Sequence, residues 1–358
     1  MRHTITKAGW VMTLLLLIGT FTSCDKTVRK TEIADNVITN ESLIETAVIR
    51  EPLVFITGVD KGDNDFYKSA RQYFIEKEYE VVDDAFSLEE IINWLNNNYD
   101  NRLYGEIHIV SHSNPWKGMS LETVIKGDRI TVASLQKNAI ESNIPTLKNV
   151  IASDAKVVFH SCGLGENKAL LKLFKNIFTT NNSPQIVASP YYTIFGKEFS
   201  SHYLAKPYYN FYPTAHSPGK VDLSKEFAKK YPNEKDIDWL ETLYNDVERY
   251  VGEAYNFKFN IPVEWVVDFN DSDETAPKFK SQEAIMDWIS ENEELSKEFS
   301  NYRIPLEKFR WKSYVKDGKL IIKGKTSVVC ILKPIIKPYG DLEHVEPEID
   351  NLRLYNVE

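Results

Sequence analysis

Hydrophobic and polar positions follow two repeating patterns in the first half of the chain. Continuous apolar and β-branched runs indicate buried strands at residues 52–59, 80–85, 106–114, 155–162 and 185–190. The segments between them carry apolar residues at helical spacing and predict helices at residues 63–79, 87–99, from 133 onwards and 166–178. Strands that alternate with helices, and that are apolar on both faces, build covered parallel sheets. We therefore expect an α/β domain with a mainly parallel sheet and helices on both faces.

The pattern changes after Tyr191. An aromatic-rich stretch up to Tyr212 is expected to pack against the sheet. Further patterns predict helices within 222–256, a strand at 261–269, a helix at 281–295 and a hairpin at 311–324 that turns on Asp317 and Gly318. We expect four regions: a leader at residues 1–23, a tether at 24–50, the α/β domain at 51–220 and a C-terminal α+β subdomain at 221–358.

The first 23 residues have the features of a secretory signal peptide. Arg2 and Lys7 precede an apolar run from Trp10 to Ile18, which is short for a membrane span. The following "FTSC" resembles the lipobox of bacterial lipoproteins, in which small residues precede a cysteine that is lipidated after cleavage. This resemblance implies acylation of Cys24 and a lipid anchor in the bacterial cell envelope, at the outer membrane or the cell surface. An ordinary secreted protein is the alternative.

The charge of the chain argues against nucleic acid as a partner. The net charge is −9 at neutral pH, and loss of Arg2 and Lys7 with the leader, which contains no acidic residue, changes it to −11. A polyanion repels a protein of such charge.

Cysteine usage points to a functional thiol. Once Cys24 is acylated, only Cys162 and Cys330 remain, so an exported chain keeps two thiols without a disulfide framework. A single disulfide between Cys162 and Cys330 is the structural alternative.

Candidate chemistry lies at the ends of two predicted strands. "EIHIVSHSN" carries Ser-His and "AKVVFHSC" ends in Ser-Cys, with His112 lying 50 residues before Cys162. The carboxyl ends of parallel strands meet at one edge of a sheet, where such folds place their sites. A thiol of pKa about 8.5 needs a base or a positive field to become a nucleophile. His112 would supply the base and the helix after "GLGEN" the field, while Gly163 and Gly165 let the backbone bend.

These paired strand ends resemble the caspase-like cysteine peptidases, which include caspases, legumain, clostripain, gingipains and CHAT-type domains. The resemblance covers about residues 50–196, with "ITVASL" after the histidine. It implies a caspase-like α/β/α sandwich and an endopeptidase with Cys162 as nucleophile and His112 as general base and acid. It also implies an oxyanion site made by the backbone N–H groups of Ser113 and Cys162. The implied partner is a peptide or protein substrate, and no cofactor or metal is implied.

Other interpretations of the same residues are open. Ser113 stands where the caspase-like domains carry glycine, and a positive φ there would strain a serine. This departure and the tyrosine-rich stretch favour a non-catalytic surface lipoprotein that uses the fold as a binding scaffold. Cys162 is alternatively core filling, and His160 either packs beside the site or joins His112 and Cys162 in a metal site. "IHIVSHSNP" superficially resembles the α/β-hydrolase nucleophile elbow with Ser113 at its centre, although both glycine positions hold other residues.

The loop "GVDKGDND" suggests a substrate preference. Asp60, Asp63 and Asp65 follow the first predicted strand and fall at the same edge of the sheet as Cys162. An acidic wall there favours cleavage after Arg or Lys, because a substrate aspartate meets like charge. The alternative is a solvated turn in which Asp63 or Asp65 caps the following helix.

Overall fold

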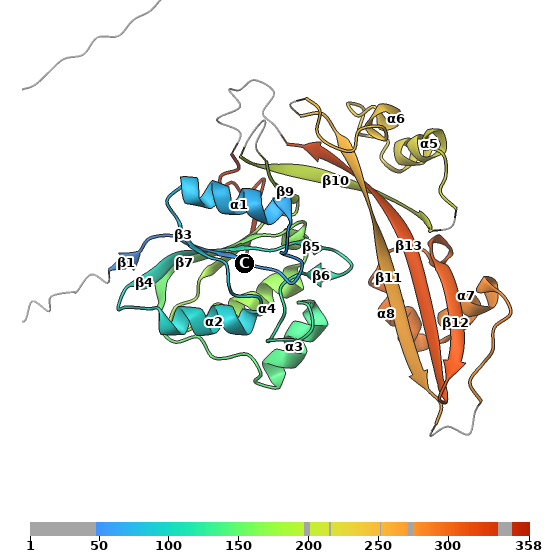
Figure 1. The fold of residues 1–358 in the computed structure, drawn as a ribbon, viewed down its shortest axis with the longest axis horizontal. Coiled ribbons are helices and arrows are strands. Elements are labelled where there is room, and N and C mark those ends of the chain that lie inside the picture. Colours follow the sequence, from blue (N-terminus) through green and yellow to red (C-terminus); the bar gives the residue numbers. More distant parts are fainter. Residues whose placement is uncertain (1–47, 197–200, 215, 251, 271–274, 336–345) are drawn as a thin grey trace, which may run out of the picture. The chain divides into compact units, whose positions relative to one another are not determined.

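The computed structural model describes residues 48–196, 201–214, 216–250, 252–270, 275–335 and 346–358 (Figure 1). The predicted signal peptide, the predicted lipidation site Cys24 and nearly all of the tether lie outside these residues. The described strands are β1 (Ile49–Arg50), β2 (Leu53–Ile56), β3 (Glu80–Val82), β4 (Leu103–Val110), β5 (Ser113–Asn114), β6 (Gly118–Met119), β7 (Ile151–His160), β8 (Gln185–Ala188), β9 (Tyr192–Phe195), β10 (His202–Pro213), β11 (Tyr255–Asp268), β12 (Arg310–Lys316), β13 (Lys319–Pro334) and β14 (Asn356–Val357). The described helices are α1 (Asp65–Glu76), α2 (Leu88–Asn97), α3 (Val132–Ile140), η1 (Leu164–Glu166), α4 (Lys168–Phe178), α5 (Lys220–Lys230), α6 (Trp239–Thr242), α7 (Gln282–Glu291), α8 (Glu293–Ser300) and η2 (Leu306–Lys308). In these residues no helix has the length and apolarity required to cross a membrane.

Seven strands form the first sheet, in the order β14-β8-β7-β4-β2-β3 with β1 beside β4. Only β14 is antiparallel to its neighbour, so the sheet is mixed but mostly parallel. The prediction of an α/β fold with a mainly parallel sheet is confirmed. The chain first runs from β2 outwards to β3 and then crosses to β4, β7 and β8, so the strand order reverses between β2 and β4. Such a reversal opens a crevice at the carboxyl ends of the two strands.

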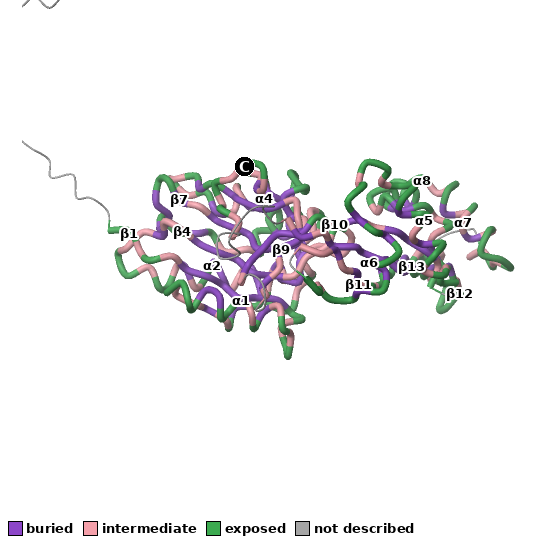
Figure 2. Tube along the Cα trace, turned by 90° about the horizontal axis from the view of Figure 1, so that it is seen from above, coloured by how far each residue is buried: buried purple, intermediate pink, exposed green. Residues whose placement is uncertain are grey.

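Helices cover both faces of this sheet (Figure 1). α2, α3 and α4 enclose one apolar core and α1 encloses another on the opposite face. Alternate side chains of β2 pack into the two cores. Leu53 and Phe55 belong to the first, whereas Val54 and Ile56 belong to the second. All four side chains are fully buried, and Figure 2 shows the buried trace running through the strands. Burial of such a side chain contributes roughly 1.5–3 kcal/mol.

Side-chain caps set the starts of the first two helices. Ser87 and Glu90 form the reciprocal capping box that the sequence predicts for α2. α1 is capped by Asn64, whose Oδ1 accepts from Phe66 N–H at 3.0 Å. The cap of α1 is important for the site described below, because it fixes which end of the Asn64 amide faces the cavity.

A second, antiparallel sheet has the order β11-β13-β10-β9, with β12 also paired to β13. The hairpin β12-β13 turns on Asp317 and Gly318, both with positive φ (49° and 71°), as predicted. The helix predicted at residues 281–295 is instead two helices, because Asn292 ends α7 and its side chain caps α8. α7 and α8 pack on this sheet around Trp311.

The division between the two sheets does not follow the predicted boundary between residues 220 and 221. β9 and β10 precede that boundary and belong to the second sheet, whereas β14 follows it and pairs with β8 of the first sheet. The hydrogen-bonded partner of a strand decides its sheet, and a local pattern of apolar residues does not contain that information.

Candidate active site

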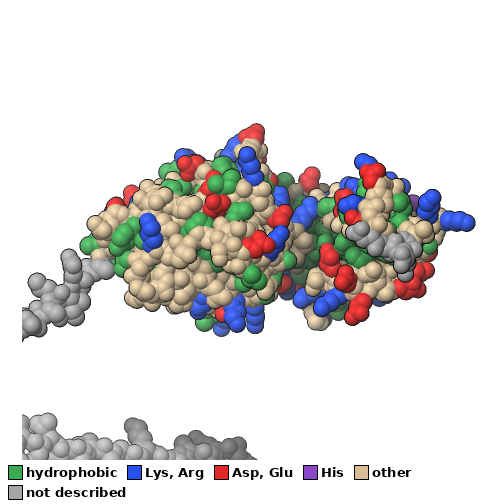
Figure 3. Space-filling view, turned by 90° about the horizontal axis from the view of Figure 1, so that it is seen from below, with side chains coloured by type: hydrophobic (Ala, Val, Ile, Leu, Met, Phe, Trp, Pro, Cys, Tyr) green, Lys and Arg blue, Asp and Glu red, His purple; other side chains and the backbone are tan. Residues whose placement is uncertain are grey.

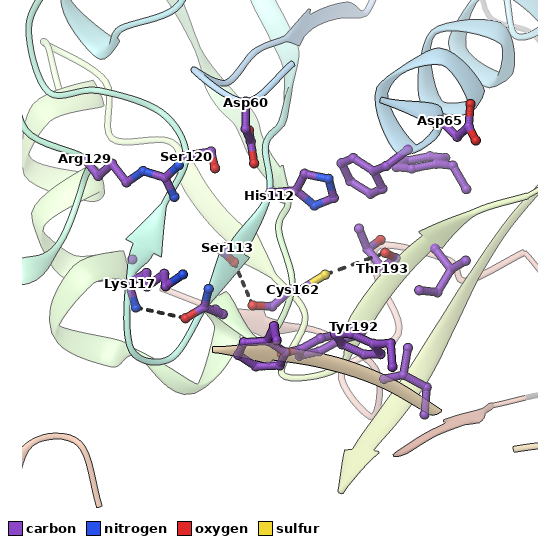
Figure 4. A pocket seen from close by; sticks show the side chains of 18 residues that line it. Asp60, Asp65, His112, Ser113, Lys117, Ser120, Arg129, Cys162, Tyr192 and Thr193 are labelled. Carbon is purple, nitrogen blue, oxygen red and sulfur yellow. Dashed lines mark hydrogen bonds between the residues drawn. The ribbon is translucent and has the colours of Figure 1, made fainter. Parts of the chain in front are cut away.

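Two strand ends bring Cys162 and His112 to one cavity. β4 and β7 are neighbours in the first sheet, and Val110 of β4 pairs with His160 of β7. His112 and Cys162 each lie two residues after this pair, so the two side chains leave the sheet at the same level. Both residues line a cavity of about 530 Å³ at the carboxyl edge of the sheet. Figure 4 shows the two side chains within this cavity. Asp60, from the loop after β2, also lines it, so the cavity lies at the reversal of strand order.

The turn that presents Cys162 depends on two glycines. Gly163 has a φ of 70°, in the region where a β-carbon is strained. Gly165 packs so closely on the end of β8 that a β-carbon there would lie 2.5 Å from Ala188 O. η1 follows this turn, and α4 begins only at Lys168. The helix N-terminus that was expected to polarise the thiol is therefore separated from Cys162 by η1.

The Cys162 thiol is buried and protonated in this arrangement. Its side chain is 8% exposed, and Sγ donates to Thr193 O at 3.8 Å. Burial raises the pKa of Cys162 to about 12. No hydrogen bond joins Cys162 to His112 within the described residues. Cys330 is also free and buried and lies in the same apolar cluster, so the two cysteines do not form a disulfide.

His112 is held by the start of α1. Its ring stacks on Phe66 with centroids 4.2 Å apart. Asn64 Nδ2 lies 3.1 Å from His112 Nε2. Because Asn64 Oδ1 accepts from Phe66 N–H, the amide nitrogen must face the ring and donate to it. His112 Nε2 is then an acceptor, and the neutral ring carries its proton on Nδ1.

Burial and nearby charges keep His112 uncharged. Desolvation lowers the pKa of His112, the neighbouring Asp60 carboxylate opposes this shift, and the Arg129 guanidinium adds to it. A neutral imidazole at neutral pH is able to accept a proton, as a general base must.

Two backbone N–H groups beside the thiol are not used by the fold. Ser120 N–H donates to His112 O at 2.7 Å, so Ser113 and Met119 are the non-hydrogen-bonded pair of the β5-β6 ladder. The ladder therefore leaves Ser113 N–H unpaired. Cys162 N–H donates to no other residue in the described part of the chain. Ser113 has no positive φ, so serine in place of glycine causes no backbone strain there.

Ser113 is not part of a nucleophile elbow. It lies in β5, which turns into the antiparallel strand β6, whereas an elbow requires a strand, a sharp turn and a helix. Its Oγ donates to Cys162 O at 2.7 Å and so joins the two strand-end segments. The α/β-hydrolase interpretation is therefore wrong.

The three aspartates after β2 do not form one acidic wall. Asp60 lines the cavity, and its Oδ1 accepts from Tyr67 Oη at 2.8 Å. Asp63 does not line it, because its carboxylate is 91% exposed and pairs with Lys68. Asp65 lies at the rim, fully in solvent, and Figure 4 shows its carboxylate turned away from the thiol. Neither Asp63 nor Asp65 caps α1.

Several residues of the cavity were not identified from the sequence. Lys117 and Arg129 line its wall on the Ser113 side (Figure 4). An apolar wall comes from residues far along the chain, and it consists of Tyr192, Ile194 and Phe195 of β9, Phe257 and Phe259 of β11, and Leu332 of β13. The aromatic stretch after residue 190 therefore both packs and lines the cavity. The sequence shows only that Lys117 and Arg129 are basic and lie between the two strand ends, and this does not indicate that they face the cavity.

A separate group of histidines is buried beneath α1. His108 Nδ1 lies 2.8 Å from His160 Nε2, and Glu106 Oε1 lies 2.6 Å from His108 Nε2. The ring of His160 packs 5.3 Å from that of His202. Burial lowers the pKa of His160 well below its ordinary value. Burial also lowers the pKa of His202, to about 3. In the described residues no group of three or more ligating side chains has the geometry of a metal site.

No family model matches this chain, and comparison with curated proteins and with solved structures gives no significant match.

Proposed function

We propose that the protein is a cysteine endopeptidase of the caspase-like type, with Cys162 as nucleophile and His112 as general base and acid. One observation carries the proposal: the ends of two adjacent parallel strands supply a thiol and an imidazole to the same cavity. The two unpaired N–H groups of Ser113 and Cys162 support it, since acyl transfer requires donors for the developing oxyanion. The mostly parallel sheet with helices on both faces also supports a caspase-like sandwich.

The reaction assigns a role to each group. His112 Nε2 leaves its hydrogen bond with the Asn64 amide and takes the proton of the Cys162 thiol, and Sγ forms a bond with the carbonyl carbon of the peptide. Ser113 N–H and Cys162 N–H donate to the oxygen that becomes negative. As the C–N bond breaks, His112 returns its proton to the leaving amine, which leaves a thioester. Water then attacks the thioester while His112 accepts its proton, and the thiol is restored.

The thiol must rotate before this reaction. Sγ donates to Thr193 O, and no thiol–imidazole bond is formed among the described residues. Rotation about the side-chain bond of one cysteine is a small change, and catalytic hydrogen bonds are often long or poorly aligned before substrate binds.

A thiol-directed probe tests the assignment. A peptidyl acyloxymethyl ketone should label the full-length protein at Cys162, and Cys162→Ala should abolish the labelling while the circular dichroism spectrum is unchanged. His112→Ala should slow the labelling at least tenfold, because a general base contributes about 10²–10⁴-fold. Cys330→Ala is the matched control, since Cys330 is buried and does not line the cavity. Equal labelling of the wild type and Cys162→Ala would refute the proposal.

A non-catalytic binding scaffold is the second candidate. It is favoured by the thiol itself, which donates to a backbone carbonyl and has a pKa raised to about 12. In that case the apolar wall of the cavity binds a ligand and no acyl transfer occurs. Cys162 would then react with the probe no faster than Cys330, the other buried thiol. His112→Ala would not change the rate.

The lipoprotein assignment is a proposal of its own. Residues 1–23 would be removed and Cys24 acylated, which would anchor the protein in the cell envelope. Incorporation of an alkynyl fatty acid should depend on Cys24, and Cys24→Ala should move the protein from the membrane fraction to the soluble fraction. Persistence of the label in Cys24→Ala would refute lipidation at this residue.

A further inference from the structure

Two cations line the cavity without an acidic partner. Lys117 and Arg129 are both partly buried. Neither side chain forms an ion pair or a side-chain hydrogen bond with any of the described residues. On the outer face in Figure 3, in contrast, positive and negative side chains are interspersed. An unpaired, partly desolvated cation is unfavourable unless a ligand supplies the counter-charge.

The two cations lie close to each other, and Arg129 also lies close to His112. The charge of Arg129 acts on both Lys117 and His112. Burial lowers the pKa of Lys117, and the neighbouring charges of Arg129 and Lys325 lower it further. Figure 4 shows the Arg129 guanidinium and Lys117 on the side of the cavity that Ser113 forms. An anion bound between them would relieve this repulsion.

The acids of the cavity do not neutralise this pair. Asp60 is hydrogen-bonded to Tyr67 Oη, and no ion pair joins it to Lys117 or Arg129. Asp65 is fully exposed, with Lys68 as its nearest cation at 3.9 Å. The cavity lining therefore carries two unpaired cations against the single Asp60 carboxylate, so its net unpaired charge is positive.

The hairpin that carries Lys117 is fixed in position. Trp116 Nε1–H donates to Tyr302 O at 2.9 Å, and its ring packs on Tyr209 and Phe211. Asn114 Oδ1 accepts from Lys117 N–H at 2.9 Å. The backbone of Lys117 is therefore already in place beside the cavity, which lowers the conformational entropy lost when an anion binds.

We propose that Lys117 and Arg129 form a carboxylate subsite, so that the preferred substrates are peptides with an aspartate or glutamate next to the scissile bond. This inference rests on the proposed peptidase function and replaces the preference for basic residues that the sequence suggested. The Arg129 guanidinium can bind a carboxylate through two parallel hydrogen bonds, in a bidentate pair, and the Lys117 ammonium adds a second positive charge beside it.

Matched peptides test the substrate preference. A peptide library first identifies a bond that the full-length protein cleaves. Quenched fluorogenic peptides are then made that carry Asp, Asn, Lys or Gln at one position next to this bond and are otherwise identical, with one set of peptides for each such position. At one of these positions, we expect kcat/KM for Asp to exceed that for Asn at least tenfold. Arg129→Gln and Lys117→Gln should bring this ratio towards one. Lys126→Gln is the matched control, because Lys126 is exposed on the same connecting segment and does not line the cavity.

A second readout does not require peptidase activity. Iodoacetate and iodoacetamide alkylate thiols and differ mainly in the negative charge of iodoacetate. The ratio of their rates at Cys162, followed by peptide mass spectrometry, should fall several-fold in Arg129→Gln and in the double variant with Lys117→Gln, but not in Lys126→Gln.

The two readouts separate the two proposals. If no peptide is cleaved but the alkylation ratio falls in the variants, the peptidase function is refuted and the anion subsite stands. If peptides are cleaved without a preference for acidic residues and the ratio is unchanged, the subsite is refuted and the peptidase function stands.

Discussion

Substitution of Asn64 by aspartate tests how α1 controls the protonation of His112. In the wild type, the Asn64 amide donates to His112 Nε2 and so stabilises the neutral ring. An aspartate preserves the cap of α1, because aspartate and asparagine are equally good at this position. Its second carboxylate oxygen would face Nε2 and accept a hydrogen bond from the protonated ring. The substitution therefore changes the favoured charge state of His112 with little change in the helix.

The size of the effect follows from the short contact. A carboxylate at the 3.1 Å that now separates Asn64 Nδ2 from His112 Nε2 is an opposite charge in direct contact with the imidazolium. Such a contact raises a histidine pKa by about 1–3 units, which corresponds to about 1.4–4 kcal/mol in favour of the charged form. The wild-type pKa starts below its ordinary value, because the ring is buried.

The assay is an NMR titration of the His112 ring protons in the wild type, Asn64→Asp and Asn64→Ser. Serine also caps a helix but does not extend to the ring, so it removes the amide donor without adding a charge. We expect the midpoint to rise slightly in Asn64→Ser and by one unit or more beyond that in Asn64→Asp. The rate of Cys162 alkylation at neutral pH should increase in the same order, because an imidazolium beside the thiol stabilises the thiolate. A midpoint in Asn64→Asp at or below that of Asn64→Ser would refute the assigned orientation of the Asn64 amide.

Further expectations concern stability. The pKa values of His112, His160 and His202 are lowered in the folded protein by burial. The unfolded chain therefore binds more protons below its ordinary histidine pKa of 6.5, so the free energy of unfolding should fall as the pH is lowered from 6.5, by up to about 1.4 kcal/mol per pH unit for each histidine. For His202 this fall extends to about pH 3, and urea titrations that showed constant stability below pH 6.5 would contradict it. Gly165→Ala should destabilise the protein by about 1–3 kcal/mol, because its β-carbon would lie 2.5 Å from Ala188 O. Gly163→Ala, where no atom is closer than 3.8 Å, should cost only the backbone strain of about 1–2 kcal/mol, and thermal unfolding that ranks Gly163→Ala as the more damaging change would count against the packing argument. Ser113→Ala removes the 2.7 Å hydrogen bond to Cys162 O and should lower stability by about 1 kcal/mol, which chemical denaturation can measure.

Much of the fold could be predicted because it depends on neighbours in the chain. The apolar runs that form β2, β4 and β7, the capping box of Ser87 and Glu90, and the turn at Asp317 and Gly318 each involve contacts within a few residues. The carboxyl-edge rule for parallel strands then predicts that His112 and Cys162 lie at one edge of the sheet, and both line the cavity there. Local periodicity and one topological rule were sufficient for these features.

The charge and the walls of the cavity were decided by the tertiary structure. Asp63 and Asp65 lie beside Asn64 in the sequence, yet both carboxylates are exposed to solvent and only the Asn64 amide contacts His112. Phe257 and Leu332 reach the cavity through the pairing of β11 with β13, which joins segments about 75 residues apart. The pKa of Cys162 depends on this enclosure, because desolvation is set by all the atoms around a group and not by its neighbours in the chain. The sequence by itself therefore determined the strands β2, β3, β4, β7 and β8, the first helices and the edge where a thiol and an imidazole meet, whereas only the folded packing decided which charges face them.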